Sequence, residues 1–251
     1  MQPQVRLLEG EAEMSELLEI ALEAHGGLDR WNEIGHVETD LSITGAIWYV
    51  KSKPDFFASV HLSAQTGTQR VELFPVGAGN RTIFEGDELT LENGDGEVVE
   101  VRKNPESSYV GQTLETPWDD LHAAFFTTTA LWTYLTTPFL YTYRGFETEE
   151  VAPRFEDGEE WRGLRVTFPD YIHSHTKYQT SYFGPDGLLR RHDYTVDLLG
   201  GATGANYALD IEDIDGIKVP TKRRIWAYDD NHEKVPEPLL VAVDIETLTF
   251  S

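Results

Sequence analysis

Side chains able to do acid–base chemistry gather in one stretch of the chain, residues 171–200, with three histidines, two adjacent arginines, a lysine and four tyrosines. The ends of this stretch predict two β-strands around the turn Gly184-Pro185-Asp186-Gly187. A paired strand normally offers one apolar face to a core, whereas here both faces carry polar groups. One face therefore lines a solvated cavity instead of a dry core, and the sequence predicts a binding or reaction site in this hairpin.

The turn fixes the register that we expect for the hairpin. Pairing of its two glycines places His192 opposite Gln179 and His175 opposite Val196. The rung of His192 is then about 13 Å along the strand from His175, too far for one ion, because ligand bonds are roughly 2 Å long. His173 and His175 point to the same face, but they would need a carboxylate from another strand. We therefore expect no metal site.

The expected cavity has polar and apolar contacts. Histidine titrates near neutral pH and is the usual acid–base residue, so His175 or His192 is the candidate general acid or base, with Tyr194 or Asp193 assisting. The alternative is that each histidine is exposed or purely structural. The expected polar contacts are His173, His175, Lys177, Gln179, Arg190 and His192, and the expected apolar and stacking contacts are Trp48, Phe126, Trp132 and Tyr194.

The sequence does not match other motifs of catalysis and cofactor binding. There is no GxSxG elbow and no cysteine, which excludes thiolate chemistry and disulfides. Residues 200–204 are rich in glycine like a phosphate loop, but a strand instead of a helix is expected after them. Residues 213–216 resemble the centre of a calcium loop, but Ile211 and Lys222 stand where oxygen ligands are needed. We expect no cofactor.

The charge of the chain narrows the class of partner. Twenty lysines and arginines against 44 acidic residues give a formal net charge of −24, which argues against DNA or RNA binding and against docking on anionic membranes. Acidity of this degree favours solubility or adaptation to a salty cytoplasm; a cationic ligand is the alternative. With no signal-peptide pattern and no run of roughly 20 apolar residues, we expect a cytoplasmic protein without membrane insertion. Its expected partner is a small-molecule ligand or substrate, and a monomer is favoured.

Two segments have the pattern of helices. Residues 11–34 carry leucines at helical spacing between glutamates, and a Gly-Gly pair should end or kink the helix. In the second segment Pro117 is expected in the first turn, and Pro138 should end the helix. This second helix, residues 117–137, is rich in aromatics and nearly free of charge. It is expected to lie across a sheet as a core helix, to form a lid over a ligand, or to do both.

The remainder of the chain alternates between short strands and turns of the Asn-Gly and Asp-Gly type. Residues 147–161 are expected to form a polar loop. The simplest assembly is one α+β domain spanning residues 1–251, in which a curved antiparallel sheet, a half-barrel of roughly ten strands, wraps around two or three helices. In its C-terminal part, strands are expected at residues 164–168, 172–183, 188–198, 206–214, 217–226 and 239–250.

Several segments resemble the LolA/LolB superfamily of bacterial lipoprotein carriers. The resemblance is carried by the strand–turn–strand rhythm of Phe84–Val98 and by Asp213–Arg224, where an Asp-Gly turn leads into a strand with a proline. Segments 118–140 and 173–197 are similar to those of a cytoplasmic bacterial branch. The resemblance covers nearly the whole chain and implies an open antiparallel sheet curled into a half-barrel and plugged by helices. Carriers of this type are exported and hold acyl chains, while the same fold occurs in a cofactor-independent enzyme of violacein biosynthesis.

Three functions are consistent with the expected cavity. The first is binding of a small, partly apolar organic molecule in the concave face of the half-barrel. The second is cofactor-independent acid–base catalysis on such a molecule, as an isomerase, cyclase, lyase or hydrolase, for instance in secondary metabolism. The third is a carrier for a hydrophobic or lipidated partner, which requires an apolar concavity, and the polar composition of the hairpin speaks against it.

Overall fold

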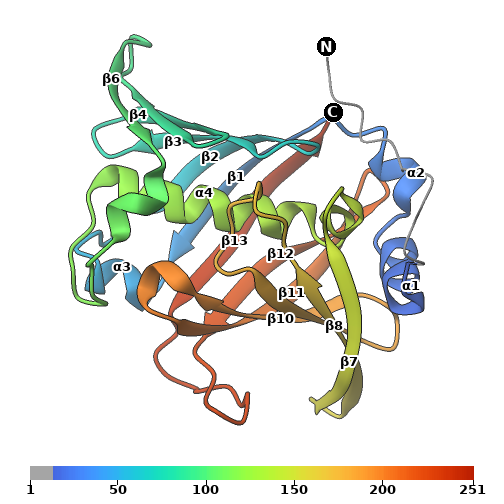
Figure 1. The fold of residues 1–251 in the computed structure, drawn as a ribbon. Coiled ribbons are helices and arrows are strands. Elements are labelled where there is room, and N and C mark those ends of the chain that lie inside the picture. The colour runs from blue at the N-terminus through green and yellow to red at the C-terminus, as the bar shows by residue number, and fades with distance from the viewer. Residues whose placement is uncertain (1–13) are drawn as a thin grey trace.

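One antiparallel sheet of 13 strands wraps around a long helix in the computed structural model, which describes residues 14–251 (Figure 1). The first half of the sheet contains β1 (His36–Thr44), β2 (Phe57–Gln65), β3 (Arg70–Val76), β4 (Asn80–Glu85), β5 (Glu88–Glu92) and β6 (Val98–Lys103). The second half contains β7 (Glu147–Glu156), β8 (Glu159–Thr167), β9 (Tyr178–Phe183), β10 (Leu189–Val196), β11 (Ala202–Ile214), β12 (Ile217–Trp226) and β13 (Val241–Phe250). The α-helices are α1 (Glu16–Ala24), α2 (Leu28–Trp31), α3 (Ala46–Val50) and α4 (Asp120–Thr136), and the short 3₁₀ helices are η1 (Pro105–Tyr109), η2 (Phe139–Thr142) and η3 (Asp197–Leu199).

The strand order is β6-β5-β4-β3-β2-β1-β13-β12-β11-β10-β9-β8-β7. Each half is a meander of strands that follow one another in sequence, and the halves meet where β1 pairs with β13, with Ile43 opposite Val243. The edges of the sheet are therefore β6 and β7, and the chain passes from one edge to the other through α4, on the concave side (Figure 1). The predicted α+β class and antiparallel sheet are confirmed, but the sheet has 13 strands instead of roughly ten.

Helix α4 is buried on all sides. Residues 123–136 are all buried, so the helix is enclosed by its surroundings instead of resting on them with one face. Thr128, Thr129, Thr133 and Thr136 take part in this burial because their hydroxyls donate to carbonyl groups one turn earlier; the hydroxyl of Thr136, for example, donates to the carbonyl of Trp132 at 2.7 Å. With these hydroxyls paired, the aromatic side chains of α4 pack in every direction.

Asp119 caps the N-terminus of α4. Its carboxylate accepts a hydrogen bond from the backbone N–H of His122 at 2.7 Å, and the N–H of Asp119 donates to the His122 ring at 3.4 Å. The helix therefore begins at Asp120, and the expectation that Pro117 occupies its first turn is wrong, because the capping residue comes two positions after this proline. Pro138 lies just beyond the last helical residues, as predicted, since proline has no N–H to continue the helix.

The glycine pair separates α1 from α2, as predicted. Gly26 and Gly27 both have positive φ, at 120° and 81°, which favours glycine. A Cβ atom on Gly26 would lie 2.2 Å from the carbonyl oxygen of Gly216, so this glycine also lets the end of α1 approach the β11–β12 turn. Residues 11–13, the start of the predicted helix, lie outside the described part of the chain.

Residues 147–161 form a hairpin, and the prediction of a polar loop is wrong. β7 pairs with β8 from Glu147 opposite Thr167 to Glu156 opposite Glu159. Because β7 is an edge strand with most side chains exposed, it has no apolar face, and alternation of apolar and polar residues cannot reveal it.

The predicted strand 172–183 is shorter in the structure, where β9 begins at Tyr178. Residues 169–177, here called the crossing segment, leave the sheet and reach the β2–β3 connection. There the side chain of Gln69 donates to the carbonyl of His173 at 2.7 Å and accepts from its N–H at 2.9 Å. These bonds satisfy the backbone of the segment without a neighbouring strand.

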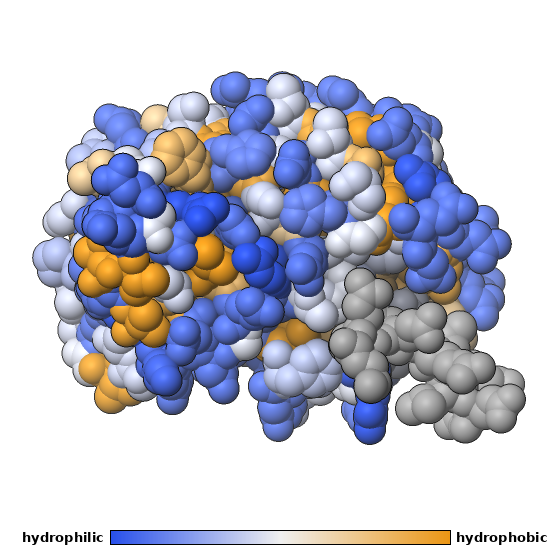
Figure 2. Space-filling model, turned by 90° about the horizontal axis from the view of Figure 1, so that it is seen from above, coloured by the Kyte–Doolittle hydropathy of each residue, from blue (hydrophilic) through white to orange (hydrophobic). Residues whose placement is uncertain are grey.

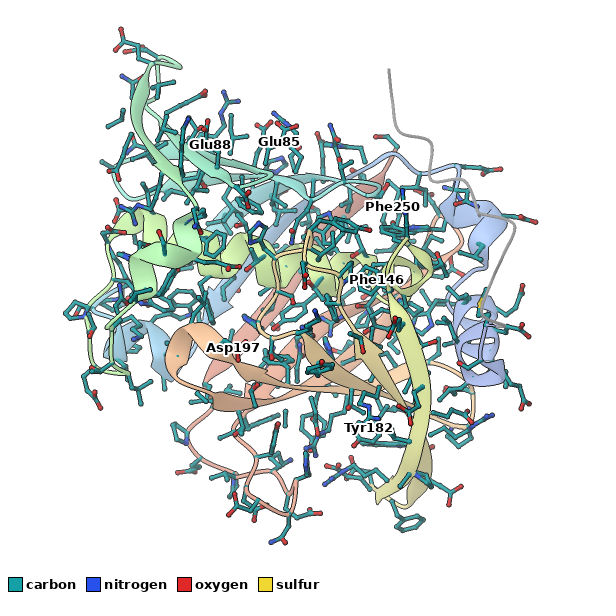
Figure 3. The ribbon with its side chains drawn as sticks, viewed as in Figure 1. Glu85, Glu88, Phe146, Tyr182, Asp197 and Phe250 are labelled. Carbon is teal, nitrogen blue, oxygen red and sulfur yellow. The ribbon has the colours of Figure 1, made fainter. Side chains whose placement is uncertain are left out.

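The outer surface is mainly polar, in agreement with the net charge. Figure 2 shows hydrophilic side chains over most of one face, with small hydrophobic patches between them. Glu85 and Glu88, near the β4–β5 turn, point away from α4 (Figure 3). In the part of the chain that the structure describes, no helix is long and apolar enough to cross a membrane.

We expect Asp119→Ala to lower the free energy of unfolding by about 1 kcal/mol, because it removes the cap of the central helix. The ion pair of Asp119 with Arg102, at 2.9 Å, is half-exposed and adds little. For a chain of this size, Tm should fall by about 2–4 °C in calorimetry. Asp230→Ala, at an exposed loop position, is the control and should leave Tm unchanged. An unchanged Tm for Asp119→Ala would contradict the capping role.

Candidate functional site

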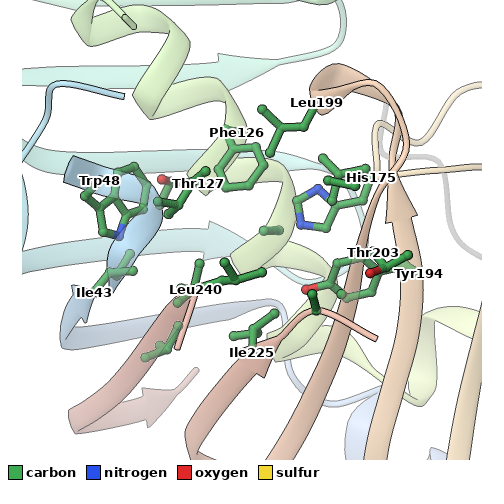
Figure 4. A pocket seen from close by; sticks show the side chains of 18 of the residues that line it. Ile43, Trp48, Phe126, Thr127, His175, Tyr194, Leu199, Thr203, Ile225 and Leu240 are labelled. Atoms are coloured by element: carbon green, nitrogen blue, oxygen red, sulfur yellow. The ribbon is translucent and has the colours of Figure 1, made fainter. Parts of the chain in front are cut away.

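A cavity of about 360 Å³ lies between α4 and the inner face of the sheet. None of the residues that line it is acidic, although the chain contains 44 acidic residues, and none is a lysine or arginine. Trp48 of α3 and His175 of the crossing segment lie on opposite sides of the cavity (Figure 4). Most of the wall is aliphatic or aromatic and includes Ile43, Ile47, Leu114, Phe126, Leu131, Val196, Leu199, Ile225, Leu240, Val241 and Val243.

This wall differs from the polar chamber that we expected. Among the lining residues the groups with titratable or strongly polar side chains are His175, Tyr134 and Tyr194, joined by the hydroxyls of Thr127 and Thr203. The composition of the hairpin suggested a wetter cavity because its polar residues were assigned to one continuous face. In the structure they are divided between the cavity, the layer behind it, the outer face of the sheet and the solvent.

Tyr134 of α4 and Tyr194 of β10 meet at the polar end of the cavity. Their hydroxyl oxygens are 2.6 Å apart, and the His175 ring centroid lies 4.7 Å from that of Tyr194. Burial raises the pKa of both tyrosines, so both hydroxyls keep their protons at neutral pH. Burial lowers the pKa of His175 to about 4, so its ring is neutral. Together these side chains offer uncharged donors and acceptors at one end of an apolar space.

Gly204 of β11 makes room for the ring of Tyr194. The two residues are opposite each other in the β10–β11 pairing, and a Cβ atom on Gly204 would lie 2.5 Å from Cε2 of Tyr194. A side chain at this position would displace the ring. Because residue 204 is a glycine, the Tyr194 ring can take the position that brings its hydroxyl to the cavity.

A row of buried polar side chains lies behind the two tyrosines, on the inner face of β9 to β12. Ser181, His192 and Asn206 are direct neighbours across the strands, and Arg223 lies on β12. Nε2 of His192, both amide atoms of Asn206 and Nη1 of Arg223 have no hydrogen-bond partner among the described residues. Burial, with a smaller contribution from the charge of Arg223, lowers the pKa of His192 to about 3. His192 is thus neutral and does not line the cavity itself.

The register that we expected for the hairpin is wrong. His192 lies opposite Ser181 instead of Gln179, because Gly184 bonds to Leu188 at the turn and the pairing of β9 with β10 shifts again between Leu189 and Arg191. A bulge of this kind adds a residue to one strand and is not visible in the alternation of residue types.

Asp193 and Arg191 point to the outer face of the sheet. The guanidinium of Arg191 donates to both carboxylate oxygens of Asp193, at 2.6 and 2.9 Å, and to Glu156 at 3.1 Å. Tyr207 also donates to Glu156. These contacts compensate a guanidinium that is fully buried. The sheet separates Asp193 from the cavity, so this residue is not placed to assist His175.

Two further residues expected in the cavity are buried elsewhere. The indole of Trp132 donates to the carbonyl of Gln65 at 2.8 Å, and the amide of Gln179 donates to the carbonyl of Thr176 at 2.9 Å. Neither lines the cavity. Both connect parts of the chain that enclose it, Trp132 between α4 and β2, and Gln179 between β9 and the crossing segment.

Two of the expected cationic contacts lie at the surface instead. Lys177 is exposed and pairs with Asp170 at 2.7 Å. Arg190 pairs with Asp186 at 2.9 Å and with Glu159 at 3.5 Å. Neither lines the cavity.

His173 anchors the crossing segment outside the cavity. Its Nδ1 lies 2.7 Å from Glu106 and its Nε2 lies 3.0 Å from Asp87. Burial lowers the pKa of His173, but the hydrogen bonds and charges of the two carboxylates together raise it above 6.5. His173 therefore connects the crossing segment to η1 and to the β4–β5 turn, and the two carboxylates favour its protonated form.

Sequence reasoning missed three residues of the site: Tyr134, Gly204 and Arg223. Tyr134 lies eight residues after Phe126 on α4, and this helical spacing places both on one face, which was the available signal. Arg223 shares one face of a correctly predicted strand with the buried residues Val219 and Ile225, so a basic side chain on the inner face was also detectable. The role of Gly204 depends on the ring across from it, which only the strand pairing reveals.

The polar end is suited to hydrogen bonding more than to metal chemistry. Within residues 14–251, no three histidine, cysteine, aspartate or glutamate side chains are grouped to hold a metal ion. The cavity can accommodate an apolar body and meet a polar group at the end of Tyr134, Tyr194 and His175.

Comparison with known proteins identifies relatives in fold. No protein-family model matches the chain, and no curated protein matches its sequence. One similar solved structure is a DUF1329 family protein from Desulfovibrio piger, with 13% sequence identity and a TM-score of 0.53; the match covers 94% of this chain and 92% of the other. Another is a LolA superfamily protein from Nitrosomonas europaea, with 11% identity and a TM-score of 0.50, and this match covers 94% and 92% of the two chains. A third is a putative outer membrane lipoprotein-sorting protein domain from Vibrio parahaemolyticus, with 10% identity and a TM-score of 0.54; the match covers 93% of this chain and 92% of the other.

The chain has a LolA-like fold. At 10–13% identity these similarities show the fold alone, and they cover nearly the whole chain, as the resemblance in sequence implied. Assignment to a cytoplasmic branch stays a prediction.

We expect the anchor formed by His173 to weaken as pH rises. Because the pKa of His173 is raised in the folded state, its contribution to stability is complete below the unfolded pKa of about 6.5 and is lost as pH rises through the folded value. Between pH 6 and 9, the unfolding free energy of the wild type should therefore fall relative to that of His173→Gln, measured by urea denaturation. His61→Gln, at a half-exposed histidine of β2 that pairs with Asp40, is the control. Parallel pH profiles for wild type and His173→Gln would contradict the anchor.

Proposed function

We propose that this protein binds a small, partly apolar organic molecule in the cavity between α4 and β10–β13. One observation carries the proposal: a cavity of about 360 Å³ whose wall is apolar except at one end. Ligand sites in proteins are concave and mostly apolar, and a few polar groups in them fix the orientation of the ligand. Here those groups are Tyr134, Tyr194 and His175. They come from α4, β10 and the crossing segment, so three separate parts of the chain must be in place to form the site.

Unpaired polar groups in the cavity wall support the proposal. The indole nitrogen of Trp48 and the hydroxyl of Thr127 are buried without hydrogen-bond partners among the described residues, and both residues line the cavity. Leaving such groups unpaired costs free energy. We propose that a bound molecule with an acceptor near α3 pairs with them.

Catalysis is the second candidate, and His175 is the observation that favours it. Its ring borders the cavity beside Tyr194, and burial alone accounts for its lowered pKa, with no hydrogen-bonded partner contributing. A free imidazole next to a phenol is a reasonable acid–base pair. However, a pKa of about 4 makes His175 a weak base at neutral pH, so we rank binding first. His192 lies behind the wall and is the poorer candidate.

A carrier for a hydrophobic partner uses the same apolar wall, and this wall supports that function more than the sequence did. Native mass spectrometry of the purified protein distinguishes the candidates. A bound small molecule supports the first function, and a bound acyl chain or lipidated peptide supports the carrier. For the enzyme, conversion of the bound molecule should cease in His175→Ala while the fold is retained.

We expect the neutral fluorophore N-phenyl-1-naphthylamine to bind in the cavity with increased emission. Ala130→Phe should weaken binding at least tenfold, because Ala130 lines the cavity from α4 and the larger ring fills the space. Circular dichroism should show an unchanged fold. Ala58→Phe, the same change at an exposed position of β2, should bind the fluorophore like the wild type. Equal binding by Ala130→Phe would show that the fluorophore, and the proposed site, lie elsewhere.

A further inference from the structure

Arg223 is a buried cation without a counter-charge among residues 14–251. Its side chain is 3% exposed, and its contacts are with Tyr134: Nη2 donates to the backbone carbonyl at 2.9 Å, and the guanidinium carbon lies 4.7 Å from the ring centroid. Nη1 has no hydrogen-bond partner among the described residues. The described residues that act on the pKa of Arg223 are tyrosines, with no aspartate or glutamate among them.

Arg191 shows how this chain buries an arginine for structural purposes. It is also fully buried, but its guanidinium contacts Asp193, Glu156 and the Tyr207 hydroxyl. The two arginines lie on neighbouring parts of one sheet, Arg191 on the outer face and Arg223 on the inner face. A buried guanidinium keeps its charge and is costly to leave uncompensated. In a chain with 44 acidic residues, the lack of one near Arg223 therefore requires an explanation.

The position of Arg223 beside the cavity explains why it has no acidic partner. It borders a small void of about 10 Å³, and this void shares Leu131, Tyr134 and Val243 with the wall of the main cavity. A single layer of side chains thus separates the guanidinium from the cavity. The charge of Arg223 lowers the pKa of both Tyr134 and Tyr194, against the larger effect of burial. Its field therefore reaches the hydroxyls at the polar end.

The two tyrosines supply the hydrogen bond that an anion needs. Their hydroxyls are bonded to each other at 2.6 Å, and one such bond uses one of the two protons. The second proton is left for another acceptor, either the amide of Asn206 behind the tyrosines or a group in the cavity. In the part of the chain that the structure describes, no acidic residue lines the cavity to repel a negative charge.

We infer that the ligand carries a carboxylate, or an oxyanion of similar size, and that this group lies against Tyr134, Tyr194 and His175 in the field of Arg223. The inference rests on the proposed function and deepens it: the ligand is an acidic amphiphile, with its apolar body toward Trp48. Arg223 is a positioning residue here, since Tyr134 lies between it and the ligand. The net charge of −24 opposes the approach of anions, so the preference arises inside the cavity and not at the surface.

The test compares a matched pair of probes, naphthalene-2-acetic acid and naphthalene-2-acetamide, by isothermal titration calorimetry at pH 7. The two have nearly the same shape, and only the acid is charged. The acid should bind the wild type at least tenfold more tightly than the amide, the size expected for charges several ångströms apart at an effective dielectric constant of about 20. Arg223→Met should bring the two affinities within about twofold of each other, and Arg223→Lys should retain part of the preference. Arg224→Met, the same change one position along β12 at a residue paired with Asp244, should leave the preference unchanged.

Arg223→Met should fold, because methionine replaces a buried charge that has no partner. Should it fail to fold, Tyr194→Phe provides the second test: loss of the hydroxyl should weaken binding of the acid by about fivefold more than binding of the amide. Equal binding of acid and amide to the wild type, or an unchanged preference in Arg223→Met, overturns the inference while leaving the cavity as a neutral site. Failure of both probes and of N-phenyl-1-naphthylamine to bind overturns the proposed function, and the inference with it.

Discussion

Burial of α4 against the concave side of the sheet is the contact on which the rest of the structure depends. In the described part of the chain the two meanders share one strand pair, β1 with β13. Helix α4 joins them a second time: Trp132 bonds to β2, Tyr134 meets β10, and the Tyr134 carbonyl accepts from Arg223 on β12. Because the edges β6 and β7 are not neighbours in the sheet, the sheet stays open, and the helix fills the concavity that closure of a barrel would have removed.

The cavity is the part of this concavity that α4 does not fill. On the face that includes Phe126, Ala130 and Tyr134, the small side chain of Ala130 leaves space opposite β11 and β12. Well-packed proteins contain few voids larger than a water molecule. A space of about 360 Å³ at this place is therefore a feature of the fold that the surrounding residues maintain, and its apolar wall and polar end agree with a ligand site.

The C-terminal strands bury an arginine on each of their two faces, and the two arginines differ in their partners. On the outer face, Arg191 is surrounded by carboxylates and a phenol, as expected for a structural ion pair. On the inner face, His175 and His192 are neutral and Arg223 has no carboxylate nearby. A fold under selection for stability alone has little reason to retain the second arrangement, since apolar residues of similar volume would pack there at lower cost. The contrast connects the inner cluster with the cavity beside it.

The amino-acid sequence by itself determined the fold class, the enclosed aromatic helix, most strand positions and the stretch that supplies two polar residues of the site, His175 and Tyr194. These features follow from the local alternation of residue types, from turn signals and from proline, which act over a few neighbouring residues. Only the tertiary structure decided which polar side chains share a space. A bulge at residues 189–191 shifted the partner of His192, the sheet separated Asp193 from the cavity, and carboxylates far away in sequence took His173 out of the site. The pairing of strands across more than 100 residues also brought Tyr134 and Trp48 to one cavity, because hydrophobic burial selects the arrangement of the whole chain and not of any one segment.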